Sequence, residues 1–481
     1  MRRARTFWRS AFWRPVPAVA FLLLVAGCSG TAASPRLFVL ITVDTLRADY
    51  LGAYGSPRGL TPRLDALAEE SVVFTSAYSA TAFTLPSVSA ILTGRYPEEL
   101  GIWNNESAVP RSVPTLAAAL REHGWRTGAI VSNFVLRASS GLAAGFDVYD
   151  DDFPQREAVR HWPERTAGNT TEAFFRTLDA CTTGEAPCFV WVHYQDPHGP
   201  YTPPPGYRER HLEAEREAPD GRRRLPVLPS GQAGLGAIPH YQYLNQEHEV
   251  AFYRAGYDAE VAYMDEEVGR LLDGLAERGL ADAALLVFTA DHGEGMGEYD
   301  YWFGHGEHLM DPLVRVPLLI RTPGARPGRR DDLVAAVDVF PTVLGALGVS
   351  DGERPPLGRD LLAADAAASP SVAYLATLGA GSVRRLGIVD GDYKFIVSLH
   401  DGVWDALLFR RGNESVNLAA PAPQIASSFR ARLTEFRARL PLRAEIRQEV
   451  SSEDLERLRA LGYVDVPQPD PAEPSPDPPD G

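Results

Sequence analysis

Acidic and imidazole side chains stand at the ends of two apolar runs that lie far apart in the chain. Asp44 follows the run 37–43, and Asp291 with His292 follows the run 285–289. In an open α/β sheet, ligands bind in the crevice beyond the carboxyl ends of the strands, so these three side chains are expected to meet. Taken alone, an Asp at a strand end is also explained as the N-cap of the next helix. Together, two carboxylates and a neutral imidazole are donors for a divalent cation of the Mn, Zn or Mg type.

A hydroxyl group stands at the start of a predicted helix between these two segments, in the letters TAFTLPSVSAILTGRYP. Pro86 suits the first turn of this helix, 87–92 fills its middle, and Gly94 suits its end. Thr84 then precedes the helix N-terminus, where backbone N–H groups stabilise a bound anion or a developing alkoxide. A simple N-cap role for Thr84 remains the alternative.

Two further segments place histidines beside strand ends. The letters FVWVHYQDPHGPYTPP put Asp196 and His198 just after a buried run, and FGHGEHLMDPLVRVPLLI puts His305 and His308 in a Gly-rich loop before the next one. A single histidine in such a place is more often structural. Several histidines at the same edge of a sheet instead favour a polar site at that edge.

The elements that position these residues follow from the apolar pattern. Runs of four to eight apolar residues without strict alternation are typical of strands buried on both faces, and helical periodicity lies between them. This alternation predicts an α/β fold with a largely parallel central sheet flanked by helices. The expected strands are Leu37–Val43, Gly128–Ser132, Phe189–Tyr194, Leu285–Thr289 and Val316–Ile320, and the clearest helices are Thr61–Glu70, Val113–His123 and Tyr257–Arg278.

The composition changes at several points along the chain. Residues 204–245 are rich in Pro, charge and Gly, which predicts an irregular surface insertion near the site. Beyond about residue 370, strand-like pieces surround 393–397 and a helix is expected near 423–440, so a small C-terminal subdomain follows the first domain. The predicted organisation is a signal peptide at 1–27, a catalytic α/β domain at 36–365, a C-terminal subdomain at 366–464 and a disordered tail, rich in Pro and acidic residues, at 465–481.

The first 27 residues have the pattern of an export signal. A basic start is followed by the apolar run 16–26, which is too short for a stop-transfer helix. The run ends in Val-Ala-Gly-Cys, which resembles a bacterial lipobox with Cys28 as the lipidated first residue of the mature chain. We therefore expect a lipoprotein of the bacterial cell envelope, bound to the membrane through Cys28 on the periplasmic side or at the outer membrane. An uncleaved signal anchor is the alternative.

Charge and cysteine content narrow the function classes. The 481 residues carry 47 Lys and Arg against 63 Asp and Glu, a net charge of −16, which gives no electrostatic basis for nucleic-acid binding. Three cysteines cannot form a four-cysteine zinc site. Cys181 and Cys188 either close a small disulfide in an exported chain or remain two buried thiols.

These motifs together resemble the sulfatase family of the alkaline phosphatase superfamily, over about residues 36–465. The segments that carry the resemblance are ITVDTLRADYLGAYG, TLPSVSAILTGRYPEELGI, VHYQDPHGPYTPP, YDAEVAYMDEEVGRLL, TADHGE, GHGEHLMDPLVRVPLL, VDVFPTVLGALG and LRALGYVD, in that order. The resemblance implies an alkaline-phosphatase-like fold and a metal-assisted attack on a sulfate or phosphate ester. It implies roles as metal ligands for Asp44, Asp291 and His292, as nucleophile for Thr84, and in holding the ester oxygens and protonating the leaving group for His198 and His305. Lys394, in the segment GDYKFI, receives no chemical role.

The chain departs from the family pattern at the nucleophile. Typical sulfatases have Cys-x-Pro-Ser-Arg, whose Cys becomes formylglycine, where this chain has Thr-Leu-Pro-Ser-Val at 84–88. Thr84 cannot become formylglycine, and Val88 removes the Arg. Thr45 replaces a second Asp, and His292 replaces an Asn. Such a donor set is less negative and softer, which shifts the preference for the single divalent cation from Ca towards Mn or Zn.

The sequence therefore predicts a metal-dependent hydrolase of sulfate or phosphate esters with a Thr nucleophile. A hydroxyl nucleophile suits phosphorus, whereas the family resemblance favours sulfate. The expected substrate is a small-molecule ester or a glycan or lipid ester. Two alternatives remain: a transferase that moves a phospho-alcohol group through Thr84, and a catalytically silent ester-binding homologue.

Overall fold

The computed structural model describes residues 35–156, 163–229, 234–350, 357–364, 372–379, 383–400 and 403–444. The expected signal peptide 1–27, the expected lipidation site Cys28 and the tail 465–481 lie outside these residues. No helix within the described ranges combines the length and the apolar character needed to cross a membrane.

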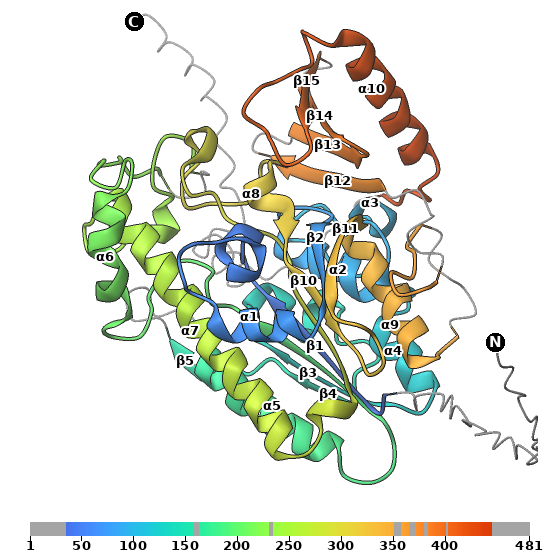
Figure 1. Ribbon diagram of the computed structural model, residues 1–481. Helices are drawn as coiled ribbons and strands as arrows, with labels where there is room; N and C mark the ends of the chain where they lie inside the picture. The colour runs from blue at the N-terminus through green and yellow to red at the C-terminus, as the bar shows by residue number, and fades with distance from the viewer. Residues whose placement is uncertain are drawn as a thin grey trace, which may run out of the picture. The chain divides into compact units, whose positions relative to one another are not determined.

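A nine-stranded sheet forms the centre of the fold, with the strand order β11-β2-β10-β8-β1-β7-β3-β4 and with β9 paired to β2 (Figure 1). Every residue of its three middle strands, β8, β1 and β7, is buried, as their unbroken apolar runs predict. The strands are β1 (Leu37–Val43), β2 (Val72–Tyr78), β3 (Arg126–Val131), β4 (Val148–Asp150), β7 (Cys188–Tyr194), β8 (Ala284–Ala290), β9 (Arg315–Val316), β10 (Leu318–Arg321) and β11 (Gly328–Ala335).

The sheet is largely parallel, as predicted, but not wholly so. Strand β1 runs parallel to both β7 and β8, whereas β10 runs antiparallel to β8 and β2. The single strand expected at Val316–Ile320 is two strands, because Pro317 separates β9 from β10 and has no N–H group for a ladder bond.

Helices flank this sheet. Figure 1 shows α5 and α7 side by side, and α5 also packs against β3 and β7. A second group, formed by α2, α4 and α9, packs together around α2. The helices are α1 (Pro62–Glu69), α2 (Thr84–Thr93), α3 (Pro97–Leu100), α4 (Leu116–Glu122), α5 (Ala167–Cys181), α6 (Tyr207–Glu217), α7 (Val250–Glu277), α8 (Asp311–Val314), α9 (Val339–Leu347) and α10 (Pro423–Ala438).

A second, antiparallel sheet follows in the C-terminal part of the chain. Its order is β12-β13-β14-β15, and α10 packs against β13 and β14. Lys394 of β14 is fully buried, and its Nζ lies 2.7 Å from Oδ1 of Asp311 and 2.8 Å from Oε1 of Glu414. Since Asp311 begins α8, this ion-paired cluster links the C-terminal sheet to the part of the chain that forms the central sheet. The strands are β12 (Val372–Gly379), β13 (Val383–Asp390), β14 (Tyr393–His400) and β15 (Val403–Arg410).

The insertion at 204–245 was expected to be irregular, and this is wrong for its first part. Residues 207–217 form helix α6, which packs against α7. The sequence did not predict this helix, because it has many charged side chains and only Glu215 is buried, so it shows no apolar periodicity. The described residues of the later part, 218–229 and 234–245, are irregular as predicted apart from a short 3-10 helix at His240–Gln242, which brings Tyr241 to His198.

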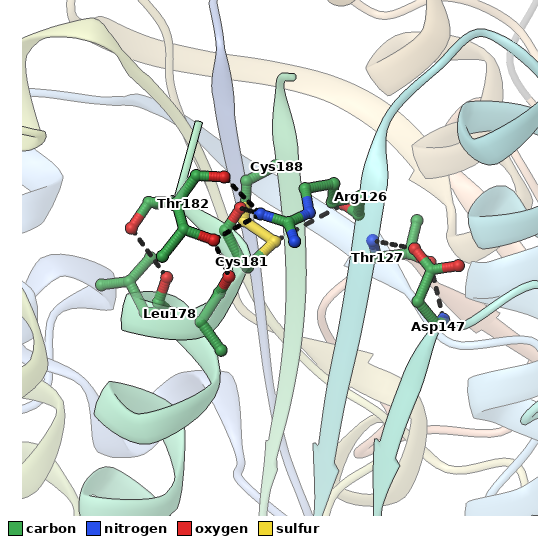
Figure 2. The surroundings of a disulfide bond; sticks show 9 residues. Arg126, Thr127, Asp147, Leu178, Cys181, Thr182 and Cys188 are labelled. Carbon is green, nitrogen blue, oxygen red and sulfur yellow. Dashed lines mark hydrogen bonds between the residues drawn. A yellow bond between two sulfur atoms is a disulfide. The ribbon is translucent and has the colours of Figure 1, made fainter. Parts of the chain in front are cut away.

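A disulfide joins Cys181 at the end of α5 to Cys188 at the start of β7. It closes the turn between this helix and this strand, as Figure 2 shows. The Arg126 guanidinium donates to the carbonyl of Cys181 at 3.3 Å and so holds the same turn. The disulfide alternative is therefore confirmed over two free thiols. The bond lies at the amino end of β7, the opposite end of that strand from His193.

Candidate active site

Strand register brings three side chains of metal-ligand type together at the carboxyl ends of the middle strands. Val43, the last residue of β1, is level with Tyr194 of β7 and Ala290 of β8. Asp44, Asp291 and His193 therefore converge, and one ligand atom from each lies within 4.8 Å of the others. All three side chains are fully buried.

Several polar atoms at this point have no hydrogen-bond partner. They are Oδ1 of Asp44, Oδ2 of Asp291, Nε2 of His193 and Oγ1 of Thr45. A buried polar atom without a partner is costly, whereas a cation that these atoms coordinate removes that cost. Two carboxylates and an imidazole also match the donors of Mn²⁺ or Zn²⁺ sites. The residues present therefore fit the divalent cation that the sequence predicts.

His292 adds a second imidazole to this cluster. Its Nδ1 lies 2.9 Å from the carbonyl oxygen of Gly293, which can only accept, so the neutral ring carries its proton on Nδ1. The lone pair is then on Nε2, which lies 3.5 Å from Oδ2 of Asp291 and 3.9 Å from Oδ1 of Asp44. This is the tautomer that a metal ligand requires.

Thr84 is the first residue of α2 and not its N-cap. Phe83 holds the cap position, and Gly94 ends the helix in the left-handed conformation at φ 64°. Thr84 is fully buried, and its Oγ1 lies 3.3 Å from Nε2 of His292. The same helix turn is tied to the residue that follows β8, because the Ser87 hydroxyl donates to the carbonyl of Asp291. The N-cap alternative is wrong, because the side chain of Thr84 faces the cluster.

A row of three imidazole rings leads away from the cluster. The ring centroids of His292 and His305 are 4.6 Å apart, and those of His305 and His198 are 5.0 Å apart. Tyr241 from the insertion stacks on His198 at 6.2 Å. His308, in contrast, packs on the ring of Tyr301 and does not join the row. The structure thus brings together all six residues to which the sequence assigned a role: Asp44, Thr84, His198, Asp291, His292 and His305.

Glu294 contacts His305, the middle ring of this row, and was not predicted from the sequence. Its Oε1 lies 3.2 Å from Nδ1 of His305, and its Oε2 accepts from the hydroxyl of Tyr201 at 3.1 Å. Arg47 donates to its carbonyl oxygen at 3.2 Å. These contacts fix the orientation of the His305 ring.

Burial dominates the ionisation of the cluster. It raises the pKa of Asp44 and Asp291 well above their usual values, and Asp44 raises that of Asp291 further. It lowers the pKa of His193 to about 4 and that of His305 to about 3, and it lowers the pKa of His292 well below its usual value. The imidazoles are therefore neutral near pH 7, as metal ligation requires.

Thr45 holds a strained backbone conformation beside Asp44 and Asp291. Its φ is 54°, in the left-handed region, which is unusual for a β-branched residue and costs about 1–3 kcal/mol. Its N–H donates to Oδ1 of Asp291 at 3.1 Å, and its carbonyl accepts from Tyr257 at 2.7 Å. The Thr45 N–H thereby helps to orient the Asp291 carboxylate. Val88, where the family has Arg, is fully buried in the apolar core.

Three residues at the site were missed from the sequence: His193, Glu294 and Asn133. The Nδ2 group of Asn133 donates to Oδ2 of Asp44. His193 lies inside an apolar strand, where a histidine is usually structural. Strand register would have shown it, because Thr42, two residues before Asp44, is level with His193.

Comparisons with known proteins place this geometry in a family. The sulfatase family model matches residues 36–349. The chain is 26% identical over 393 residues to the iduronate 2-sulfatase of Homo sapiens. This alignment covers 66% of this chain and 70% of that protein. It is 25% identical over 365 residues to the choline-sulfatase of Rhizobium meliloti (strain 1021), with 66% and 69% covered. The crystal structure of the phosphonate monoester hydrolase of Agrobacterium radiobacter shares the fold, with a TM-score of 0.66 and 22% identity over 84% of this chain and 95% of that one.

The matched residues contain the strand ends that supply the aspartates and the helix that begins at Thr84. The chain therefore belongs to the sulfatase family and is an ester hydrolase of that family.

Proposed function

We propose that this chain hydrolyses sulfate or phosphate esters with Thr84 as the nucleophile. One divalent cation, Mn, Zn or Ca, is held by Asp44, Asp291 and His292. The observation that carries this proposal is the 3.3 Å separation between Oγ1 of Thr84 and Nε2 of His292. It puts a hydroxyl, at the first residue of a helix, beside the donors of a cation site.

The chain's own groups account for the two halves of the reaction. Oγ1 of Thr84 gives up its proton and forms a bond to the sulfur or phosphorus, the bond from that atom to the alcohol oxygen breaks, and the alcohol leaves with a proton. His198 and His305 hold the ester oxygens. Because His305 is neutral near pH 7, the imidazole that protonates the alcohol first takes up the proton that Thr84 gives up, and Glu294 orients His305 for this task. Water then releases the sulfate or phosphate from Thr84. When bound, the cation supplies charge neutralisation at the ester oxygens and favours loss of the Thr84 proton.

The nucleophile favours phosphorus over sulfur. Thr84 has no aldehyde hydrate with which to expel sulfate, whereas a phospho-threonine can be resolved by water. We therefore expect phosphate mono- or diesters to turn over faster than sulfate monoesters. A panel of aryl esters of the three classes, assayed with Mn²⁺ or Zn²⁺, tests this, and a clear preference for sulfate would overturn it.

The leaving group is the alcohol of a small molecule or of a glycan. The names of the relatives support this, since they include a choline-sulfatase, an iduronate 2-sulfatase and an ulvan-active sulfatase. The insertion 204–245 contacts the site through Tyr241 on His198, so we propose that it selects this alcohol. Exchange of Tyr241 for Ala should change KM more than kcat, and by different factors for different substrates. Equal KM changes for all substrates would contradict this role.

We also propose that the chain is lipid-anchored in the cell envelope through Cys28. The lipobox-like end of the apolar run 16–26 supports this. Metabolic fatty-acid labelling should be lost in Cys28→Ser, and labelling that persists in the variant would overturn the proposal.

A further inference from the structure

His193 faces the cation site from within a strand. It is the sixth residue of β7 and fully buried, and its Nε2 lies 3.6 Å from Oδ2 of Asp44. That distance is too long for a hydrogen bond, and Nε2 has no other partner. It matches the separation of two ligands on one ion, since atoms about 2.1 Å from a tetrahedral centre are about 3.4 Å apart.

The other ring nitrogen of His193 is held by Thr42 on the neighbouring strand. Thr42 is level with His193 in the β1–β7 register, and its Oγ1 lies 2.8 Å from Nδ1. The same oxygen accepts the indole N–H of Trp191 at 2.9 Å. The Thr42 hydroxyl thus contacts two side chains of β7, His193 and Trp191, and fixes the plane of the His193 ring.

One tautomer of His193 leaves Nε2 free to bind a cation while Thr42 Oγ1 accepts the proton on Nδ1. A proton on Nε2 would be a buried donor without an acceptor, because Asp44 is beyond hydrogen-bond distance. A proton on Nδ1 is instead donated to Oγ1 of Thr42. The lone pair of Nε2 then points to Asp44 and Asp291, the arrangement in which an outer hydrogen bond orients a ligating histidine.

We infer that His193 is a further ligand of the cation and that Thr42 is its positioning residue. The donor set then contains two imidazole nitrogens, from His193 and His292, besides the two aspartates. Ca²⁺ takes almost only oxygen ligands, whereas Zn²⁺ and Mn²⁺ accept imidazole, so the site selects Zn²⁺ or Mn²⁺ over Ca²⁺. This inference rests on the cation site of the proposed function and adds the class of cation.

Titration calorimetry on the chelator-treated full chain tests the inference without an activity assay. His193→Gln should weaken Zn²⁺ binding by at least about tenfold, and Thr42→Val by about tenfold, which is the low end for loss of an outer-shell partner. Thr42→Ser keeps the hydroxyl and should stay within about threefold of the wild type. Ca²⁺ should bind wild type and variants about equally weakly.

Thr289→Val is the matched control. Thr289 is buried, is level with Thr42 on the other side of β1, and donates to the carbonyl of Pro317 at 2.8 Å instead of contacting His193. This variant loses a buried threonine hydroxyl at the same level of the sheet as Thr42→Val does. General damage to the sheet would therefore lower its Zn²⁺ affinity as well. Its Zn²⁺ affinity should remain that of the wild type.

Pulsed EPR of bound Mn²⁺ counts the imidazole ligands directly, which keeps the test valid if a variant fails to fold. We expect the nitrogen modulation of two imidazoles in the wild type and of one in His193→Gln. A single imidazole in the wild type, or unchanged Zn²⁺ affinity in His193→Gln, would overturn the inference and leave the proposed hydrolase intact. Absence of cation binding in the wild type would instead overturn the proposed cation site itself.

Discussion

Oγ1 of Thr84 lies 3.3 Å from Nε2 of His292, across 208 positions of sequence. The contact joins the first residue of α2 to the end of β8, and Ser87 ties the same helix turn to the backbone of Asp291. The helix N-terminus and the strand end therefore form one rigid unit. A hydroxyl held there by two elements is positioned before any substrate binds, which is what a nucleophile requires.

Asp291→Asn should lose most of the bound cation and most of the activity together. A cation that binds only the folded state stabilises it by about 2.7 kcal/mol at a hundredfold excess over its Kd. Chelation should therefore lower the Tm of the wild type and leave that of Asp291→Asn almost unchanged. Asp265→Asn is the control, because Asp265 is equally buried but accepts from the backbone of Arg63 and Leu64. Equal chelation shifts in wild type and Asp291→Asn would show that Asp291 is not a ligand.

Asp196 should make the protein less stable as the pH rises from about 4 to about 7. Burial raises the pKa of Asp196 to about 7, against the lowering effect of a hydrogen bond from the backbone of Ala167. In that window the folded state holds a proton that the unfolded state has lost, so the free energy of unfolding falls with rising pH, by at most about 1.4 kcal/mol per unit. Asp196→Asn keeps the hydrogen-bond acceptor and removes this contribution. Denaturant unfolding at several pH values measures it, and identical slopes for variant and wild type would contradict the assignment.

Lys394→Met should destabilise the protein without changing the chemistry. It leaves the buried carboxylate of Glu414 and the partly buried carboxylate of Asp311 without their cation, and loss of one member of a buried ion pair costs about 3–5 kcal/mol. Arg432→Met is the control, since the Arg432 pair with Asp390 is exposed and is worth less than about 1 kcal/mol. Denaturant midpoints should separate the two variants, and equal losses would mean that the Lys394 cluster is not a structural link.

Removal of the disulfide should affect stability alone. Cys181→Ala with Cys188→Ala opens a short loop, which costs about 2–3 kcal/mol of unfolding free energy. Since Cys188 begins β7 and His193 lies near its other end, kcat and KM should stay those of the wild type. A loss of activity in protein that is still folded would contradict this separation.

The sequence predicted those parts of the fold in which one local signal dominates. Strand β1 has the predicted bounds, because seven consecutive buried residues leave a clear apolar run. Strand β11 was missed, because the first part of GRRDDLVA is charged and only its last three residues are buried. The long helix α7 begins at Val250, before its predicted start at Tyr257, since its early residues pack on α6 and are not periodic in sequence alone.

The same distinction applies to the site. Asp44, Asp291 and His292 stand at strand ends and were predicted. His193 was not, because its role depends on the register of β7 against β1, which no local pattern encodes. Asn133 and Glu294 act on other site residues through single hydrogen bonds, and such contacts appear only once the chain is folded.

The measurement that tests the central claim most directly is turnover and cation content in Thr84→Ala and Thr84→Ser. Because Asp44, Asp291 and His292 remain, both variants should bind the cation. Thr84→Ala should lose turnover of every ester, whereas Thr84→Ser, which keeps the hydroxyl, should retain part of it. Mass spectrometry of rapidly quenched wild type should find the phosphoryl or sulfuryl group on the peptide that contains Thr84. Unchanged turnover in a folded, cation-bound Thr84→Ala protein would contradict the account and remove Thr84 from the reaction.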